Sequence, residues 1–214
     1  MPVTLSAAVE HLLRSRTQAP DRLRLLAQYC VEAFAQEGLE GVGGGKATEI
    51  GIRGLGRQKN WDLAFVLAQK PRLLISLKSM LKNIPGSVPN RLDDLMGEAA
   101  NVQQLSPELV IGYVIIMDVK EDSAHRSGGT WIHYFESNLG RIAIRKAPIW
   151  NQGLIEGAWV IRIDSRKPLG QMILNPVQTD QRGLQFVRDL LSELYLREPI
   201  LRITKPAQST NPIC

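Results

Sequence analysis

The stretch "NWDLAFVLAQKPRLLISLKSM", residues 60–80, decides the fold prediction. Two runs of aliphatic and aromatic residues flank "QKP", a pattern that predicts two β-strands joined by a tight turn. This hairpin also carries a charge near each end, at Asp62 and Lys78. Because burying an unpaired charge is costly, the two residues are expected to form an ion pair, to lie at a solvated rim or to belong to a site.

Around the hairpin, helical and strand-like patterns alternate. Their order predicts an α/β fold, a mixed β-sheet flanked by α-helices, in one domain over residues 1–205 with a flexible tail over 206–214. Polar loops are predicted over 37–60 and 83–90. The predicted helices lie within 5–37 (broken at Pro20) and over 91–105, 130–146 and 182–198, and the further strands over 108–119 and 157–165.

The bulk composition is that of an ordinary soluble protein. The 214 residues are 44% hydrophobic and 22% charged. The net charge of +5 and the pI near 9.4 suit a nucleic-acid binder, although basic enzymes are common. Cys30 and Cys214 are too isolated for a metal motif. With no signal-peptide layout and no apolar run long enough to span a membrane, we expect a cytoplasmic protein.

The Gly-rich stretch over residues 37–60 resembles a phosphate-binding loop only superficially. A Walker A loop needs a glycine and a hydroxyl residue where this sequence has Glu40 and Ala47. The alternatives are a basic loop that meets phosphates and a solvated linker. Its cations are Lys46, Arg53, Arg57 and Lys59.

Alternation along the hairpin predicts where its polar side chains meet. Residues two apart on a strand share a face, so Ser76 and Lys78 are expected on the same face. The antiparallel partner strand brings Asp62 beside this pair. An acid, a lysine and a small polar residue are therefore expected at one rim of the sheet.

The "WD" at 61–62 and the "SLK" at 76–78 resemble the two halves of the PD-(D/E)xK nuclease motif, 14 residues apart from Asp62 to Ser76. The resemblance runs from about residue 49 to 164. It implies the restriction-endonuclease-like fold and a Mg²⁺-dependent endonuclease similar to type II restriction enzymes. It further implies double-stranded DNA as substrate and a homodimer that cuts both strands.

Ser76 departs from this motif, which usually has an acid at that position. Some restriction enzymes read S-x-K and take the missing carboxylate from the following helix. In this sequence Arg91, Asp94 and Glu98 share one face of the predicted helix. Glu98 is the favoured replacement and Asp94 the alternative. If neither carboxylate reaches the site, the domain is expected to bind DNA without cutting it.

The resemblance assigns roles to the site residues. Asp62 and Glu98 would bind Mg²⁺ beside Ser76, with the main-chain carbonyl of Leu77 as a further ligand. Glu49 is an additional metal candidate, whose alternative is a surface position. Lys78 would hold or deprotonate the attacking water. The structural alternative is a cross-strand ion pair of Asp62 and Lys78, worth about 0.2–1 kcal/mol.

Further basic residues are candidates for DNA contact. Arg141 and Arg145, one turn apart on a predicted helix, would form a ridge along the phosphate backbone. Arg126, next to His125 in a predicted loop, would reach base edges. Arg91 would meet the backbone near the site. The alternative for all of them is a solvated basic surface.

Overall fold

The computed structural model describes residues 2–16, 19–44, 50–148 and 151–203, and its main sheet has five strands in the order β1-β4-β5-β6-β7. β4 and β5 are antiparallel, whereas β5, β6 and β7 run parallel. A separate antiparallel hairpin consists of β2 and β3. The strands are β1 Gly43–Gly44, β2 Ile50–Arg53, β3 Gln58–Trp61, β4 Leu63–Leu67, β5 Lys70–Met80, β6 Val110–Asp118 and β7 Gly157–Ile163.

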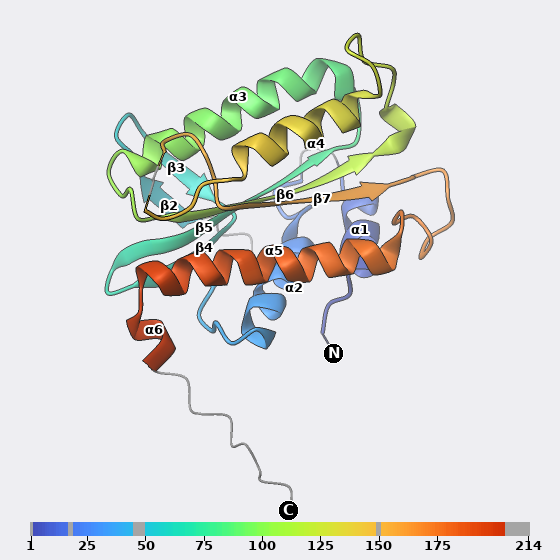
Figure 1. The fold of residues 1–214 in the computed structure, drawn as a ribbon. Coiled ribbons are helices and arrows are strands. Elements are labelled where there is room, and N and C mark those ends of the chain that lie inside the picture. Colours follow the sequence, from blue (N-terminus) through green and yellow to red (C-terminus); the bar gives the residue numbers. More distant parts are fainter. Residues whose placement is uncertain (1, 17–18, 45–49, 149–150, 204–214) are drawn as a thin grey trace, which may run out of the picture.

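Helices cover both faces of the main sheet, so the predicted α/β fold with a mixed sheet is confirmed (Figure 1). α3 and α4 lie on one face, and α1, α2 and α5 on the other. The helices are α1 Leu5–Arg14, α2 Arg24–Gln36, α3 Ile84–Gln103, α4 Trp131–Ile142, α5 Pro176–Arg197 and the short α6 Ile200–Ile203, with a 3-10 turn at Val119–Glu121.

β6 is the centre of the hydrophobic core. All nine of its residues are buried, as expected for a strand covered on both faces. Alternate residues of β5 and β6 face two separate apolar layers. Leu74 and Ile111 pack under α3 and α4, whereas Leu73 and Val110 pack against α1, α2 and α5.

The predicted hairpin is present, with its turn slightly earlier than "QKP". Ala68 and Gln69 form the turn and both have positive φ, 49° and 63°. A two-residue turn with two left-handed residues matches the twist of the strands it joins. Since β4 runs back along β5, the start of β4 lies near the carboxyl end of β5. This geometry places Asp62 near Lys78.

The predicted loops are partly wrong. Residues 43–44 and 50–53 form β1 and β2 within the predicted loop 37–60, and β3 (58–61) starts within that loop and ends one residue after it. α3 starts at Ile84 rather than at 91, and α5 at Pro176 rather than at 182. In both cases a left-handed asparagine, Asn83 or Asn175, precedes the helix and a proline occupies its first turn, where a missing N–H costs little.

Two further expectations concern the C-terminal tail and membrane-spanning segments. The predicted tail over 206–214 lies outside the described residues. Within the described part of the chain, no helix is long and apolar enough to cross a membrane.

Candidate active site at the carboxyl end of β5

Asp62, Leu77 and Lys78 meet at the margin between β4 and β5. The Asp62 Oδ2 accepts a hydrogen bond from the Leu77 N–H at 2.7 Å and lies 3.9 Å from the Lys78 Nζ. The side chains of Asp62 and Lys78 are 20% and 24% exposed, so they are close to solvent without being fully solvated. The predicted proximity of this acid and this lysine is therefore present.

The main chain of Leu77 faces the same carboxylate. In an extended strand, the N–H and the C=O of one residue point to the same side. Because the Leu77 N–H points to Asp62, its carbonyl oxygen also faces the Asp62 side of β5. The structure thus presents a carboxylate and a main-chain oxygen on one side of the strand.

Ser76 lies behind this margin and is buried, with 1% of its surface exposed. Its parallel partner on β6 is Tyr113, which is equally buried. Neither hydroxyl has a hydrogen-bond partner among the described residues. Burial raises the pKa of the Tyr113 phenol, with Asp94 and Asp62 adding to the rise and Arg91 opposing it. Two unsatisfied hydroxyls therefore form the inner wall beside Asp62.

The two helix acids predicted as alternatives have different partners. Glu98 forms an ion pair with Lys59 of β3, and their side chains are only 12% and 16% exposed. Asp94 lies 3.8 Å from Arg91 and is 59% exposed. Glu98 is therefore the more enclosed acid, but its carboxylate is engaged by a lysine, a partner that its helical spacing does not reveal.

Lys59 links Glu98 to the Asp62 region. Burial lowers the pKa of its ammonium to about 8, and the charges of Lys78 and Arg57 lower it further. Asp94 and Asp62 act in the opposite direction. A direct ion pair such as that with Glu98 also favours the charged form. The mutual influence of Lys59, Lys78 and Asp62 places these charges in one electrostatic neighbourhood.

The β2–β3 hairpin is attached to α3 through Asn101. The Asn101 side chain accepts hydrogen bonds from the N–H groups of Gly56 (2.8 Å) and Arg57 (3.3 Å) and donates one to the Arg57 carbonyl at 2.9 Å. The main-chain carbonyl of Asn101 accepts a further hydrogen bond from the Leu55 N–H at 2.9 Å. One asparagine thus holds the turn of the β2–β3 hairpin against α3. Lys59 of the same hairpin pairs with Glu98, which lies one helical turn before Asn101 on α3.

The predicted basic ridge of Arg141 and Arg145 is wrong at Arg145. α4 ends at Ile142, and Arg145 is only 1% exposed, with its guanidinium paired to Glu156 at 2.6 Å. It cannot contact a DNA backbone from this position. Arg141 is exposed on the last turn of α4, so one cation of the predicted ridge remains.

The other predicted DNA contacts lie in different places. Arg57 is exposed at the turn of the β2–β3 hairpin, and Arg91 lies beside Asp94 on α3. Arg126 is exposed in the turn before α4, where His125 stacks on Tyr134 at 4.2 Å between ring centroids. Arg57 and Arg91 are therefore near the candidate site, whereas no contact joins Arg126 to it among the described residues. Lys46 and Glu49 lie outside the described residues.

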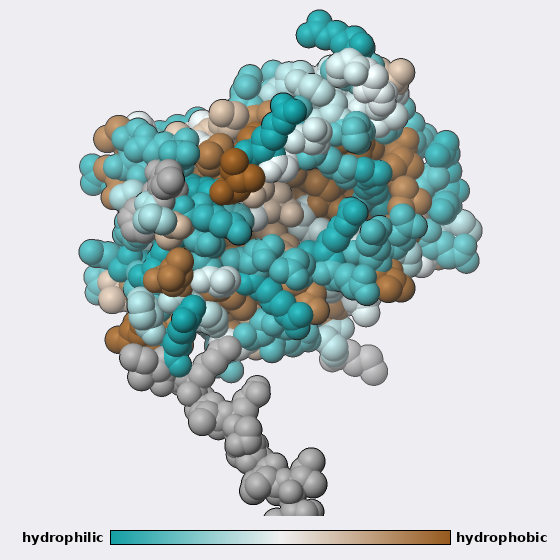
Figure 2. Space-filling model, viewed as in Figure 1, coloured by the Kyte–Doolittle hydropathy of each residue, from teal (hydrophilic) through white to brown (hydrophobic). Residues whose placement is uncertain are grey.

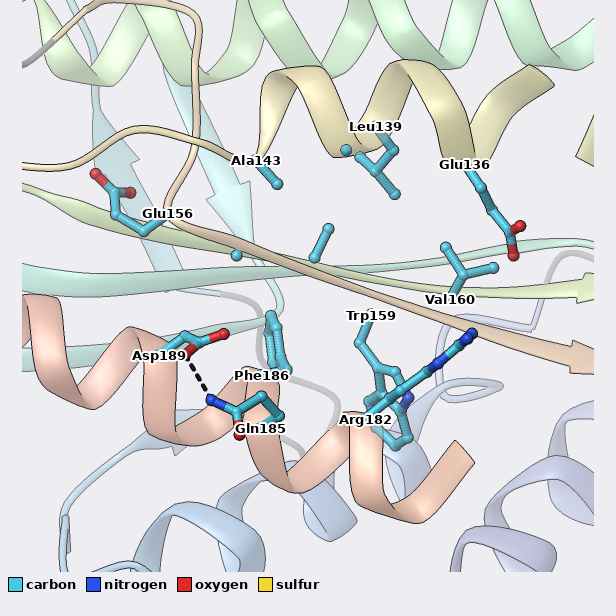
Figure 3. A pocket seen from close by; sticks show the side chains of 13 residues that line it. Glu136, Leu139, Ala143, Glu156, Trp159, Val160, Arg182, Gln185, Phe186 and Asp189 are labelled. Atoms are coloured by element: carbon cyan, nitrogen blue, oxygen red, sulfur yellow. Dashed lines mark hydrogen bonds between the residues drawn. The ribbon is translucent and has the colours of Figure 1, made fainter. Parts of the chain in front are cut away.

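A hollow of about 420 Å³ lies at the β7 edge between α4 and α5 (Figure 3). Its acid Glu136 is paired with Arg162, and Glu156 is paired with Arg145 and Arg197. Figure 2 shows this side of the molecule as largely hydrophilic with small hydrophobic patches. Both acids are therefore engaged by arginines.

The donor set around Asp62 suits a hard cation. Mg²⁺ is commonly held by one or two carboxylates, with water and substrate oxygens completing its coordination. Asp62 and the Leu77 carbonyl provide oxygens on one side of β5, and Glu98, the less exposed of the two helix acids, is paired with Lys59. No cluster of three or more His, Cys, Asp or Glu side chains suited to a metal occurs among the described residues. The described acids thus form no closed metal centre, and a hard cation here would have to be held by Asp62 and the Leu77 carbonyl together with an acid that turns toward them.

Sequence reasoning missed Tyr113 and the Glu98–Lys59 pair. Tyr113 had a detectable signal, because it carries the lone hydroxyl within the apolar run "ELVIGYVIIM". The Lys59 pairing had none, because it depends on how a hairpin within a predicted loop folds onto α3.

Comparisons with protein-family models, with curated proteins and with solved structures give no significant match to this chain.

Proposed function

We propose that the protein is a Mg²⁺-dependent DNA endonuclease that hydrolyses phosphodiester bonds, similar to a type II restriction enzyme. The observation that carries this proposal is the convergence of the Leu77 N–H and the Lys78 ammonium on one oxygen of Asp62 at the carboxyl end of β5. An acid, a lysine and a strand carbonyl at one solvent-accessible margin are the groups that this chemistry requires.

Each residue has a defined task in this proposal. Asp62, the Leu77 carbonyl and Glu98 would hold Mg²⁺, which when bound stabilises the negative charge that develops on the phosphate oxygens. Lys78 orients the attacking water and offsets charge on the phosphate. The Leu77 N–H fixes the rotamer of Asp62. Glu98 must turn from Lys59 toward Asp62 before it can complete the site.

The charge of the protein supports double-stranded DNA as substrate. The charges of Arg57 and Arg91 act on Lys59 and Tyr113, the groups on which Asp62 also acts, and they belong to a net charge of +5, which favours a polyanion. As part of the proposal, two copies related by a two-fold axis act on the two strands of a symmetric target. The same proposal places the enzyme in the cytoplasm as part of a restriction system.

Plasmid cleavage with Mg²⁺ tests the proposal. Asp62→Asn and Lys78→Ala are each expected to lower the cleavage rate at least about 100-fold, the typical contribution of a positioned acid–base group. Glu98→Gln is expected to act in the same direction. Asp93→Asn on the exposed side of α3 and Lys70→Ala at the far end of β5 are matched controls with unchanged rates. Equal cleavage by all these variants and the wild type would remove the assignment.

The second candidate is a non-cleaving DNA-binding or complex-assembly protein. Two observations favour it: Ser76 occupies the usual acid position, and Glu98 is engaged by Lys59. This candidate predicts DNA binding that weakens with salt, is the same with Mg²⁺ and with EDTA, and is accompanied by no nicking at any protein concentration. Mg²⁺-dependent nicking that is lost in Asp62→Asn would exclude it.

A further inference from the structure

A cavity of about 410 Å³ opens at the carboxyl ends of β5 and β6. Its walls come from Ser79 at the end of β5, Asp118 at the end of β6, the first turns of α3 and the connection between α1 and α2. In open sheets with parallel strands, ligands bind in the crevice outside the carboxyl ends of those strands. The cavity thus occupies the position in this fold where a ligand is most expected.

The charge of the cavity favours an anion. Its titratable lining consists of two acids, Asp118 and Glu121, and four cations: Arg22, Lys82, Arg91 and Lys120. Asp118 is 3% exposed, and its Oδ1 accepts hydrogen bonds from the main-chain N–H groups of Lys120 (3.1 Å) and Ser165 (3.2 Å). One oxygen of this carboxylate is therefore engaged by main-chain N–H groups, and among the titratable side chains that line the cavity the cations outnumber the acids by four to two.

Arg22 provides a pre-positioned donor in this cavity. It lies between α1 and α2 and reaches across to β5, where its guanidinium donates a hydrogen bond to the Ser79 Oγ. The side chain is half-buried, which restricts its orientation. The hydroxyls of Ser79 and Ser87 line the same cavity. A fixed guanidinium with neighbouring hydroxyls is a donor set that matches phosphate oxygens.

The cavity and the candidate active site are neighbours across the end of β5. Lys78 faces Asp62, and the next residue, Ser79, faces the cavity because successive side chains point to opposite faces. Arg91 lines the cavity, and its charge acts on Tyr113 together with that of Asp62. A nucleic-acid strand that crosses this end of the sheet would place one phosphate at Asp62 and Lys78 and a neighbouring phosphate at the cavity.

We propose that this cavity binds a phosphate group of a nucleic-acid strand, next to the phosphate held at Asp62 and Lys78. The substrate identity rests on the proposed function, whereas the anion site itself rests on the lining of the cavity. Arg22 is the central donor, Lys120 and Lys82 supply charge at the rim, and Ser79 keeps the Arg22 guanidinium in place.

The test measures DNA affinity without catalysis. A short duplex is titrated with the full-length protein in EDTA at several KCl concentrations, with fluorescence anisotropy as the readout. Arg22→Gln and Lys120→Gln are each expected to weaken binding about 3–10-fold and to reduce the magnitude of the salt slope by about one. Lys70→Gln, the same charge change at the opposite end of β5, is expected to alter neither quantity. Lys120 is exposed, so its variant remains informative if Arg22→Gln folds poorly.

Wild-type affinity and salt slope in both Arg22→Gln and Lys120→Gln would overturn the proposal. A parallel titration with inorganic phosphate, followed by the amide chemical shifts of Ser79 and Ser87, distinguishes the ligand source. Phosphate binding that is lost in Arg22→Gln while DNA affinity stays unchanged would refute the nucleic-acid assignment. Since Asp62→Asn is expected to bind DNA normally here, failure of cleavage would count against the proposed function alone.

Discussion

At the scale of single residues, Asp62 shows how one oxygen is held in place by two neighbours. The Leu77 N–H and the Lys78 ammonium approach the same Oδ2 from β5. This meeting was predictable, because strand alternation and an antiparallel hairpin determine which side chains share a rim. The burial of Arg145 was not predictable, because it depends on α4 ending at Ile142 and on a carboxylate, Glu156, brought in from a later segment.

Lys59 gives a prediction at this scale. Its pKa of about 8 in the folded protein lies below its ordinary value of 10.5, so between these pH values the unfolded chain binds more protons. Stability is therefore expected to rise with pH in this window, by about 1 kcal/mol once solvent screening at the rim is considered. Lys59→Met is expected to remove this rise, as measured by urea unfolding at a series of pH values.

Lys70→Met is the control for the Lys59 experiment, because Lys70 is exposed at the β4–β5 turn. This variant is expected to follow the pH dependence of the wild type. If Lys59→Met retained the full rise, the burial of its ammonium beside Glu98 would be wrong.

At the scale of elements, the β4–β5 hairpin, α3 and the central strand β6 were all visible in the sequence. Their apolar periodicities are long and regular, and a fully apolar run such as that of β6 has few alternatives to a buried strand. The β2–β3 hairpin was not visible. Its residues are rich in Gly, Lys and Arg, and its position depends on hydrogen bonds to Asn101, 44 residues after Arg57 in the chain.

Asn101→Ala is therefore expected to release the β2–β3 hairpin from α3. It removes three side-chain hydrogen bonds at Gly56 and Arg57, which together are worth about 1–3 kcal/mol in net terms. Amide hydrogen exchange of residues 54–57 is expected to accelerate strongly, while the amides of β6 keep their protection. Asn90→Ala, an exposed position on the same helix, is the control. Unchanged exchange in the Asn101 variant would show that other contacts hold the hairpin.

At the scale of the whole molecule, a buried charge cluster joins segments that are distant in the chain. Glu156 lies between Arg145 (2.6 Å) and Arg197 (2.9 Å) and also accepts a hydrogen bond from the Ile111 N–H at 2.6 Å. The cluster therefore links β6, the segment after α4 and the end of α5. No local pattern reveals such a cluster, because its members are separated by up to 86 residues, from Ile111 to Arg197.

Glu156→Gln is expected to lower the free energy of unfolding by about 3–5 kcal/mol, because it removes the carboxylate charge paired with the fully buried Arg145 guanidinium, whereas Arg197 keeps its pair with Glu193 at 3.2 Å. Glu136→Gln is the matched comparison, since its partner Arg162 is 41% exposed. A loss below about 1 kcal/mol is expected there. Denaturant unfolding of the two variants gives both values, and similar losses would contradict the account of the cluster.

The margin of the sheet at β7 has a consequence for association. The Arg162 carbonyl accepts a hydrogen bond from the Leu174 N–H at 2.9 Å, on the side of β7 away from β6. Because every second residue of a strand directs its main-chain groups to the same side, those of Ala158 and Val160 also point away from β6. Among the described residues, no strand pairs with β7 on that side. From Arg162 onward, residues 172–174 form hydrogen bonds with the main chain at this edge of β7. Ala158 and Val160 precede this paired part of the strand. An additional strand paired there would lengthen the sheet on the side remote from Asp62 and would leave the candidate site at the β4–β5 margin uncovered.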